Sequence, residues 1–187
     1  MGHIRQLSEN LANKIAAGEV VERPASVIKE LTENSIDAKA KSITILVEQG
    51  GTSKMCVIDD GIGMNRADAL LCFSRHATSK IVDENDLFNI TTLGFRGEAI
   101  PSIASISVFT LETNNGEENT KVEYEFGKRK NVGSVAMNRG TKITVERIFQ
   151  NVPARLKYMK SINAEFAAIY SYVERLALAH PEISFTL

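Results

Sequence analysis

The sequence predicts an α+β fold in which a mainly antiparallel sheet carries helices on one face. Two patterns predict it. Apolar residues recur with helical spacing over 24–38 and 163–179, and they alternate with polar residues at Ile43, Ile45 and Val47. The chain has 187 residues, of which 43% are hydrophobic and 24% are charged. This size and composition are typical of one globular domain, which we assign to residues 1–187.

Two helices open the predicted fold. The first covers residues 9–17 and stops at Gly18. The second begins at Pro24, because the fixed φ of proline suits the first turn of a helix, and it reaches Ala38. A hairpin of strands over 43–47 and 55–59 follows, turning at two glycines.

Beyond the hairpin, Asn65 is expected to cap a short helix that reaches Leu71. Residues 74–97 are rich in Gly, Ser, Thr and Asp and predict a long loop, which in a compact domain is usually functional. The remaining elements are a short helix over 98–104, a helix over 163–179 stopped by Pro181, an Asn115-Gly116 hairpin turn, and strands at 106–108, 122–126, 133–135, 143–145 and 183–187.

Composition excludes several classes of protein. No apolar run approaches the length of a membrane helix, and residues 1–6 lack a signal-peptide pattern, so no membrane partner is expected. Two cysteines are too few for a disulfide framework, which favours a cytoplasmic setting.

Charge is unevenly distributed along the chain. Residues 121–160 hold ten Lys and Arg against three Glu, so this basic segment carries +7 and the rest of the chain carries −8. A nucleic-acid-facing side and a solvated face of strands and loops both explain such a segment, and the sequence alone leaves both open.

A polar face borders the apolar stripe of the 24–38 helix. Glu30, Asn34 and Asp37 project together beside the stripe, which consists of Pro24, Val27, Ile28, Leu31, Ser35 and Ala38. A plain polar flank is one interpretation. The other is a cavity edge, where the Asn34 carbonyl oxygen binds a hard cation and Glu30 orients a water as general base.

A carboxylate turn follows the second strand of the hairpin. Asp59 precedes Gly61 and Gly63, and a Gly-x-Gly turn at a strand end lets the backbone approach a ligand while the carboxylate accepts from an exocyclic amine. A tight turn alone needs the same residues. Arg66 stands where a dinucleotide fingerprint has its third glycine, and no P-loop motif occurs.

The third pattern is the glycine-flanked run 94–99, which leads into a predicted helix. Free N–H groups at a helix N-terminus favour an anion, and Arg96 adds a cation. A flexible loop is the alternative. Together with the hydroxyls and lysine of 75–80, the three patterns outline a nucleoside triphosphate site without a P-loop.

The sequence resembles the N-terminal ATPase region of the MutL DNA mismatch repair proteins, within the superfamily shared by gyrase, large heat-shock chaperones and histidine kinases. The resemblance covers essentially the whole chain. It is carried by residues 11–26, 29–38, 75–80, 94–99 and 151–155. It implies a Bergerat-type two-layer α/β sandwich.

The resemblance also implies roles for individual residues. Glu30 would activate the attacking water, Asn34 would bind Mg²⁺, and Asp59 would accept from the adenine amino group. The remaining ATP-binding residues would be Asp37, Ala38, Gly61, Gly63, Met64 and Thr141 around the base and metal, and Thr78, Ser79, Lys80, Gly94, Phe95, Arg96, Gly97 and Glu98 in a lid around the phosphates.

The family further implies partners and missing parts. ATP binding would drive homodimerisation through residues 1–20 and signal to DNA, a mismatch-recognition protein and other repair factors. A second domain, whose lysine reaches the γ-phosphate, and a dimerisation region would lie beyond Leu187, so hydrolysis by this chain alone is expected to be weak. There are two alternatives: a nucleotide-gated DNA-binding module with negligible hydrolysis, and the ATPase domain of another superfamily member.

Two residues depart from the family pattern. Asp60 stands where the family more often has Asn, and Lys39 replaces a common Gly. Neither removes a chemical role, so altered affinity at most is expected.

Overall fold

The computed structural model describes residues 17–18, 20–74, 77 and 97–187. Within them, a seven-stranded sheet has the order β5-β4-β3-β6-β2-β1-β7. Every neighbouring pair is antiparallel except β1 and β7, which are parallel. The strands are β1 (Ser42–Glu48), β2 (Lys54–Asp59), β3 (Val108–Asn114), β4 (Asn119–Glu125), β5 (Lys128–Gly133), β6 (Gly140–Glu146) and β7 (Ser184–Thr186). The mixed, mainly antiparallel sheet is therefore confirmed.

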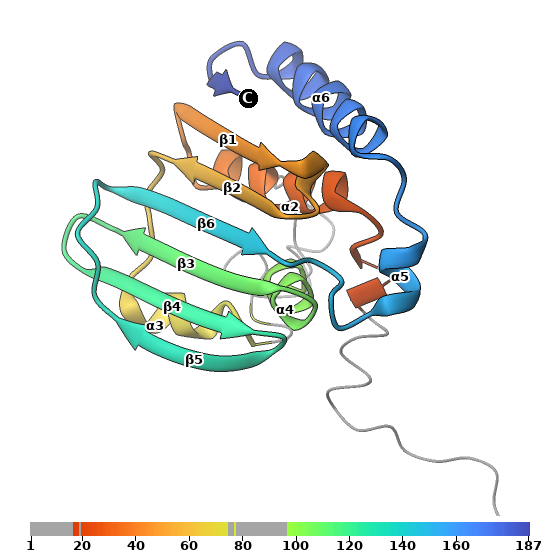
Figure 1. The fold of residues 1–187 in the computed structure, drawn as a ribbon. Helices are drawn as coiled ribbons and strands as arrows, with labels where there is room; N and C mark the ends of the chain where they lie inside the picture. The colour runs from red at the N-terminus through yellow and green to blue at the C-terminus, as the bar shows by residue number, and fades with distance from the viewer. Residues whose placement is uncertain (1–16, 19, 75–76, 78–96) are drawn as a thin grey trace, which may run out of the picture.

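Helices cover one face of this sheet, with α6 along its β1–β7 end (Figure 1). They are α2 (Pro24–Asp37), α3 (Arg66–Leu71), α4 (Ala99–Ser105), α5 (Pro153–Lys157) and α6 (Ile162–Ala179), with the 3₁₀ turn η1 (Gln49–Gly51) between β1 and β2. Helix α2 packs on β1 and β2, and α6 packs on α2 and η1. The α+β layer predicted from the sequence is confirmed.

Local signals explain where three of the helices begin. Pro24 occupies the first turn of α2. The Asn65 side chain accepts a 2.8 Å hydrogen bond from the Asp68 N–H and so caps α3 as predicted. Ser161 caps α6 in the same way, accepting from the Ala164 N–H at 3.3 Å.

The core lies between the sheet and the helices. Alternate strand residues point into it, and the buried ones include Ile43, Ile45, Met55, Val57, Phe109, Leu111, Ile143 and Val145, against Val27, Ile28 and Leu31 of α2. This alternation is the period of two that the sequence shows, so the predicted core face is confirmed.

Three expected boundaries are wrong. Gly18 does not stop the first helix, because Gly18 and Val20 are still helical and the Val21 N–H bonds the Ala17 carbonyl at 2.7 Å. The strand expected at 133–135 instead covers 128–133, a charged edge strand held by backbone pairing with β4. The strand expected at 106–108 begins at its last residue, because the Ile106 N–H bonds back to α4.

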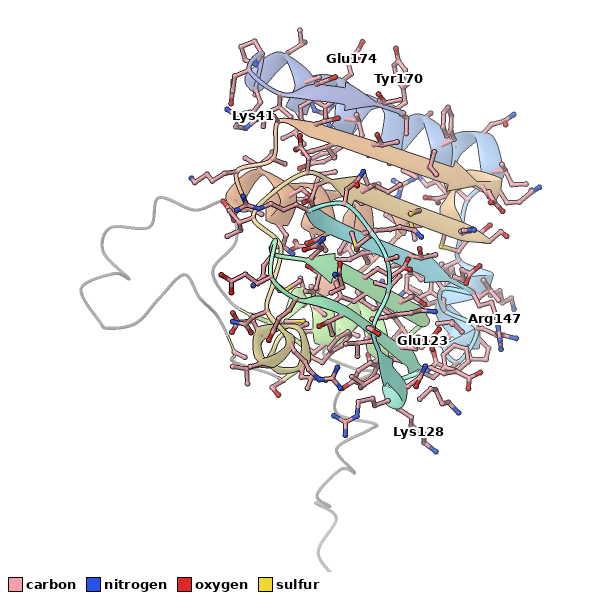
Figure 2. The ribbon with its side chains drawn as sticks, turned by 90° about the vertical axis from the view of Figure 1, so that its left-hand side faces the viewer. Lys41, Glu123, Lys128, Arg147, Tyr170 and Glu174 are labelled. Carbon is pink, nitrogen blue, oxygen red and sulfur yellow. The ribbon has the colours of Figure 1, made fainter. Side chains whose placement is uncertain are left out.

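The outer face of the sheet carries much of the basic segment. Lys142 lies 2.6 Å from Glu112, and Lys121 lies 2.8 Å from Glu123. Lys130 and Arg147 both approach Glu125, at 2.9 and 3.8 Å. Figure 2 shows Glu123 and Arg147 on this side of the molecule. Four of the ten cations in the basic segment thus have carboxylate partners on the strand face, and such exposed ion pairs are individually weak.

Candidate functional site

The C-terminus of α2 lies beside the predicted site and sets the path of the chain there. The Lys39 N–H bonds the Ile36 carbonyl at 2.9 Å, and the Ala40 N–H bonds the Ser35 carbonyl at 3.1 Å. This pair of bonds is a Schellman motif, which needs a left-handed residue just past the helix. Lys39 takes that role with φ 63°. The motif fixes the direction in which the chain leaves α2 towards β1.

The predicted polar face of α2 borders the core as expected. Glu30, Asn34 and Asp37 are all partly exposed, beside the buried stripe. The Lys29 ammonium lies 3.6 Å from Oε1 of Glu30 and 3.7 Å from Oε1 of Glu33. The predicted general base thus lies on a partly exposed flank of α2 beside a cation, within reach of solvent.

Glu33 is a buried carboxylate that the sequence pattern did not indicate. It is buried on α2, where the Tyr172 hydroxyl of α6 donates a 3.2 Å hydrogen bond to its Oε1. Burial raises the pKa of Glu33, and the nearby Lys29 opposes the rise. No periodic signal in α2 could have shown this, because α6 covers Glu33 from a distant part of the sequence.

Asp59, at the end of β2, has three donors. The Ser35 hydroxyl lies 2.8 Å from Oδ2, and the backbone N–H groups of Gly61 and Thr141 lie 2.9 and 3.2 Å from Oδ1. The residue is only 9% exposed. Burial raises the pKa of Asp59, although all three hydrogen bonds lower it and Asp60 adds to the rise. The result is a fixed, buried acceptor beside a turn.

Strand register places Asp59 in a polar row. Asp59 on β2 is the direct partner of Thr141 on β6, and Thr141 is the direct partner of Thr113 on β3. Directly opposed residues point to the same face of a sheet. Oγ1 of Thr113 and Oγ1 of Thr141 lie 3.1 Å apart. Thr113 is fully buried and was missed, since a strand threonine alone carries no site signal.

The turn after β2 brings the other base-side residues together. The Ile62 N–H bonds the Ala38 carbonyl at 2.9 Å, and a Cβ at Gly61 would lie 2.7 Å from that same oxygen. Gly63 has φ 68°, and a Cβ there would overlap the Asn114 carbonyl. The Met64 N–H then bonds Thr113 at 2.9 Å. Only glycine fits this close approach of backbones.

The structure describes two residues of the predicted lid, Gly97 and Glu98. Gly97 has φ 63°, and a Cβ there would overlap the Ala77 carbonyl, so residues 77 and 97 lie side by side. Glu98 precedes α4 as its N-cap residue. Thr78, Ser79, Lys80, Gly94, Phe95 and Arg96 lie outside the described residues.

A separate cavity of about 920 Å³ lies near α5 and the start of α6, lined by Arg23, Phe149, Asn151, Arg155 and Glu165 among others. None of the predicted site residues lines it. No helix in the described ranges is long and apolar enough to cross a membrane.

Comparison with known proteins identifies the family of the chain. Residues 22–158 match the model of the histidine kinase-, DNA gyrase B- and HSP90-like ATPases. The match spans α2, the turn after β2, and Thr141. The chain belongs to this family.

Individual relatives narrow the resemblance to MutL. The DNA mismatch repair protein MutL of Lactococcus lactis is 56% identical over 189 aligned positions, which cover 100% of this chain and 29% of that protein. The resemblance expected from the motifs is therefore confirmed. The chain spans less than a third of the length of this relative.

Solved structures agree with the fold. The N-terminal domain of a DNA repair protein superposes with a TM-score of 0.79 at 27% identity, covering 93% of this chain and 50% of that one. The Aquifex aeolicus MutL ATPase domain complexed with ADP gives a TM-score of 0.67 at 29% identity, covering 89% and 59%. These neighbours support the Bergerat-type sandwich.

The two departures from the family pattern have structural explanations. Lys39 occupies the left-handed position of the Schellman motif, where the family's glycine would be unstrained. Asp60 accepts from the backbone N–H groups of Lys41 and Ser42 at 2.7 and 2.9 Å, so its carboxylate holds the start of β1. Burial raises the pKa of Asp60, but these backbone donors outweigh it, and the pKa is lowered.

Proposed function

We propose that this chain is the ATP-binding and ATP-hydrolysing domain of a MutL-type DNA mismatch repair protein. The observation that carries the proposal is Asp59. It is a buried acceptor, fixed by Ser35, Gly61 and Thr141, at a turn where the backbones approach closely. Such a carboxylate suits an exocyclic amine, and the match to an ATPase family gives that amine an identity, adenine.

The residues around Asp59 form the rest of the proposed base site. Gly61 and Gly63 let the turn pack closely on the backbones of Ala38 and Asn114, where any side chain would collide. Thr141 adds a hydroxyl from the neighbouring strand. The Ala38 carbonyl accepts from the Ile62 N–H of this turn, and the Met64 N–H at the end of the turn donates to Oγ1 of Thr113. These contacts support base binding by all five residues.

Helix α2 supplies the proposed phosphate chemistry. Glu30 would take a proton from the attacking water, whose oxygen forms the new bond to the γ-phosphorus as ADP leaves. Asn34, one turn further along the same face, offers a neutral oxygen of the kind Mg²⁺ accepts, and Asp37 completes this polar face. Mg²⁺ bound there would neutralise charge on the phosphate oxygens. Hydrolysis then depends on positioning and electrostatics, without a covalent enzyme intermediate.

The lid residues complete the proposal. Gly97 and Glu98 precede α4, and Thr78, Ser79, Lys80, Gly94, Phe95 and Arg96 would join them around the phosphates. Closure of this lid on ATP, homodimerisation, and contacts with DNA, a mismatch-recognition protein and other repair factors are proposed for the whole protein. We also propose, for the whole protein, a second domain that carries a γ-phosphate lysine and a further dimerisation region.

Titration calorimetry with Mg²⁺ and a non-hydrolysable ATP analogue tests the base site. We expect the parent chain to bind and Asp59→Asn to bind about ten- to a hundredfold more weakly, because a charge-assisted hydrogen bond contributes about 1.5–3 kcal/mol. Asp60→Asn is the matched control, since its carboxylate faces the β1 backbone, and its affinity should stay within about threefold of the parent's. Equal binding by the parent and Asp59→Asn would contradict the adenine assignment.

The basic segment favours a second function, a DNA-binding module gated by nucleotide. This function predicts DNA binding whose affinity falls steeply with salt concentration. The match to an ATPase family favours nucleotide hydrolysis, so we rank this function below the ATPase. DNA binding that changes little with salt would exclude it.

A further inference from the structure

We propose that Thr113 is a positioning residue that orients the Thr141 hydroxyl and thereby contributes to the choice of purine base. The inference rests on the proposed function, because it concerns the same base site. Thr113 itself lies on β3, behind Thr141 as seen from Asp59, and is fully buried.

A single hydroxyl joins three segments of the chain. Oγ1 of Thr113 accepts from the Met64 N–H at 2.9 Å and lies 3.2 Å from the Gly140 carbonyl and 3.1 Å from Oγ1 of Thr141. Met64 ends the glycine turn after β2, and residues 140 and 141 begin β6. Thr113 therefore ties the two walls of the proposed base site to the same buried atom.

The hydrogen bond between Thr113 and Thr141 determines where the Thr141 proton lies. A threonine hydroxyl has one proton and two lone pairs. When Thr113 donates to the Gly140 carbonyl, it accepts from the Met64 N–H and from the Thr141 hydroxyl, and all three of its hydrogen-bonding positions are used. The Thr141 proton is then committed to Thr113, and the Thr141 oxygen presents only lone pairs to a ligand.

This arrangement gives the site a defined polarity. Asp59 and Thr141 both face the ligand as acceptors, directly opposite one another on adjacent strands. An amino group, which has two N–H donors, fits a pair of acceptors, whereas the carbonyl oxygen at the same position of guanine meets two acceptors without a proton. If Thr113 lost its hydroxyl, the Thr141 proton would be free to turn towards the ligand and accommodate a carbonyl.

Selectivity between adenine and guanine nucleotides is the decisive readout. In titration calorimetry with non-hydrolysable ATP and GTP analogues, we expect Thr113→Val to lower the affinity for the ATP analogue about five- to thirtyfold. The preference for ATP over GTP should narrow by a similar factor, since the freed Thr141 hydroxyl could donate to a guanine carbonyl, and an unmatched polar group in a buried site costs about 1–2 kcal/mol. Thr113→Ser, which keeps the hydroxyl, should retain the preference of the parent.

Thr120→Val is the matched control. Thr120 is a buried strand threonine that pairs with Thr113 from β4, one strand further from Thr141. Its loss should lower stability without changing the ratio of ATP to GTP affinity. If Thr113→Val does not fold by circular dichroism, Thr113→Cys provides the same test, because a thiol is a weak hydrogen-bonding group.

The outcomes separate this inference from the proposed function. Suppose that Asp59→Asn loses nucleotide binding but the ratio of ATP to GTP affinity is unchanged in Thr113→Val or Thr113→Cys. This result would overturn the role of Thr113 and leave the proposed ATP site intact. Absence of nucleotide binding by the parent chain would overturn both.

Discussion

The hydroxyl of Ser35 on α2 donates a 2.8 Å hydrogen bond to Oδ2 of Asp59 at the end of β2. This bond joins the helix that carries the proposed catalytic face to the strand end that carries the proposed base site. Helix and strand are consecutive layers of the fold, so the two halves of the site are positioned by one buried contact. Its consequences can be tested through the titration of Asp59.

We expect Asp59→Asn to gain stability relative to the parent chain as the pH rises. Burial raises the pKa of Asp59 above its ordinary value of 3.8, so its contribution to stability is present below that value and is lost as pH rises through the folded pKa. An asparagine does not titrate. Its oxygen can still accept from Gly61 and Thr141, and its amide can donate to Ser35, whose hydroxyl then turns to the Leu31 carbonyl at 3.1 Å.

Urea unfolding at several pH values between about 3 and 7 measures the difference in the free energy of unfolding between variant and parent. The titration of other groups largely cancels in this difference. Asp60→Asn should show the opposite slope. The pKa of Asp60 is lowered, so its contribution is present above 3.8 and lost as pH falls through the folded pKa. Parallel slopes for the two neighbouring variants would contradict this account.

Lys39→Gly should stabilise the protein by about 0.5–1 kcal/mol. A left-handed backbone costs a lysine about 1–2 kcal/mol, and glycine removes that strain while losing about 0.5–1 kcal/mol of backbone entropy on folding. The free energy of unfolding in urea measures the gain. Lys41→Gly, at a position without positive φ, has no strain to relieve and should destabilise. A loss of stability in Lys39→Gly would mean that the left-handed residue carries no strain.

Gly63→Ala should destabilise the protein more than Gly116→Ala does. Both glycines have positive φ, 68° and 99°, so each alanine carries about 1–2 kcal/mol of backbone strain. At Gly63 the added Cβ would also overlap the Asn114 carbonyl, which adds about 1–3 kcal/mol to the loss of stability. At Gly116 nothing lies within 4 Å of the added Cβ. Thermal unfolding of both variants checks the order, and equal losses would rule out the close approach at Gly63.

Tyr172→Phe should lower the free energy of unfolding by about 1–2 kcal/mol. The change removes the 3.2 Å hydrogen bond to Glu33 and leaves a buried carboxylate with one donor fewer. Tyr170→Phe on the same helix is the control, since Tyr170 is 53% exposed and points away from the fold in Figure 2. Equal stability of the two variants in urea would show that Glu33 does not depend on Tyr172.

Local chemistry explains which parts of the fold the sequence predicts. Proline at the start of α2 and the Asn65 cap are signals that act within a few residues, and both elements appear where they were expected. The predicted position of β5 is wrong because half of its residues are charged and its first four residues are exposed, which leaves no alternating apolar pattern. The glycine at position 18 predicts a helix stop, but glycine tolerates the helical conformation at a modest cost, and Gly18 is helical.

Spacing within one element, or a short motif, is enough to predict the periodicity of the elements, the polar face of α2, the strand-end position of Asp59 and the resemblance to MutL. Other features follow from the folded chain alone: Thr113, Thr141 and Asp59 form one row, and Tyr172 covers Glu33. These contacts join residues 28 to 139 positions apart, and only strand register and helix packing bring such distant side chains together.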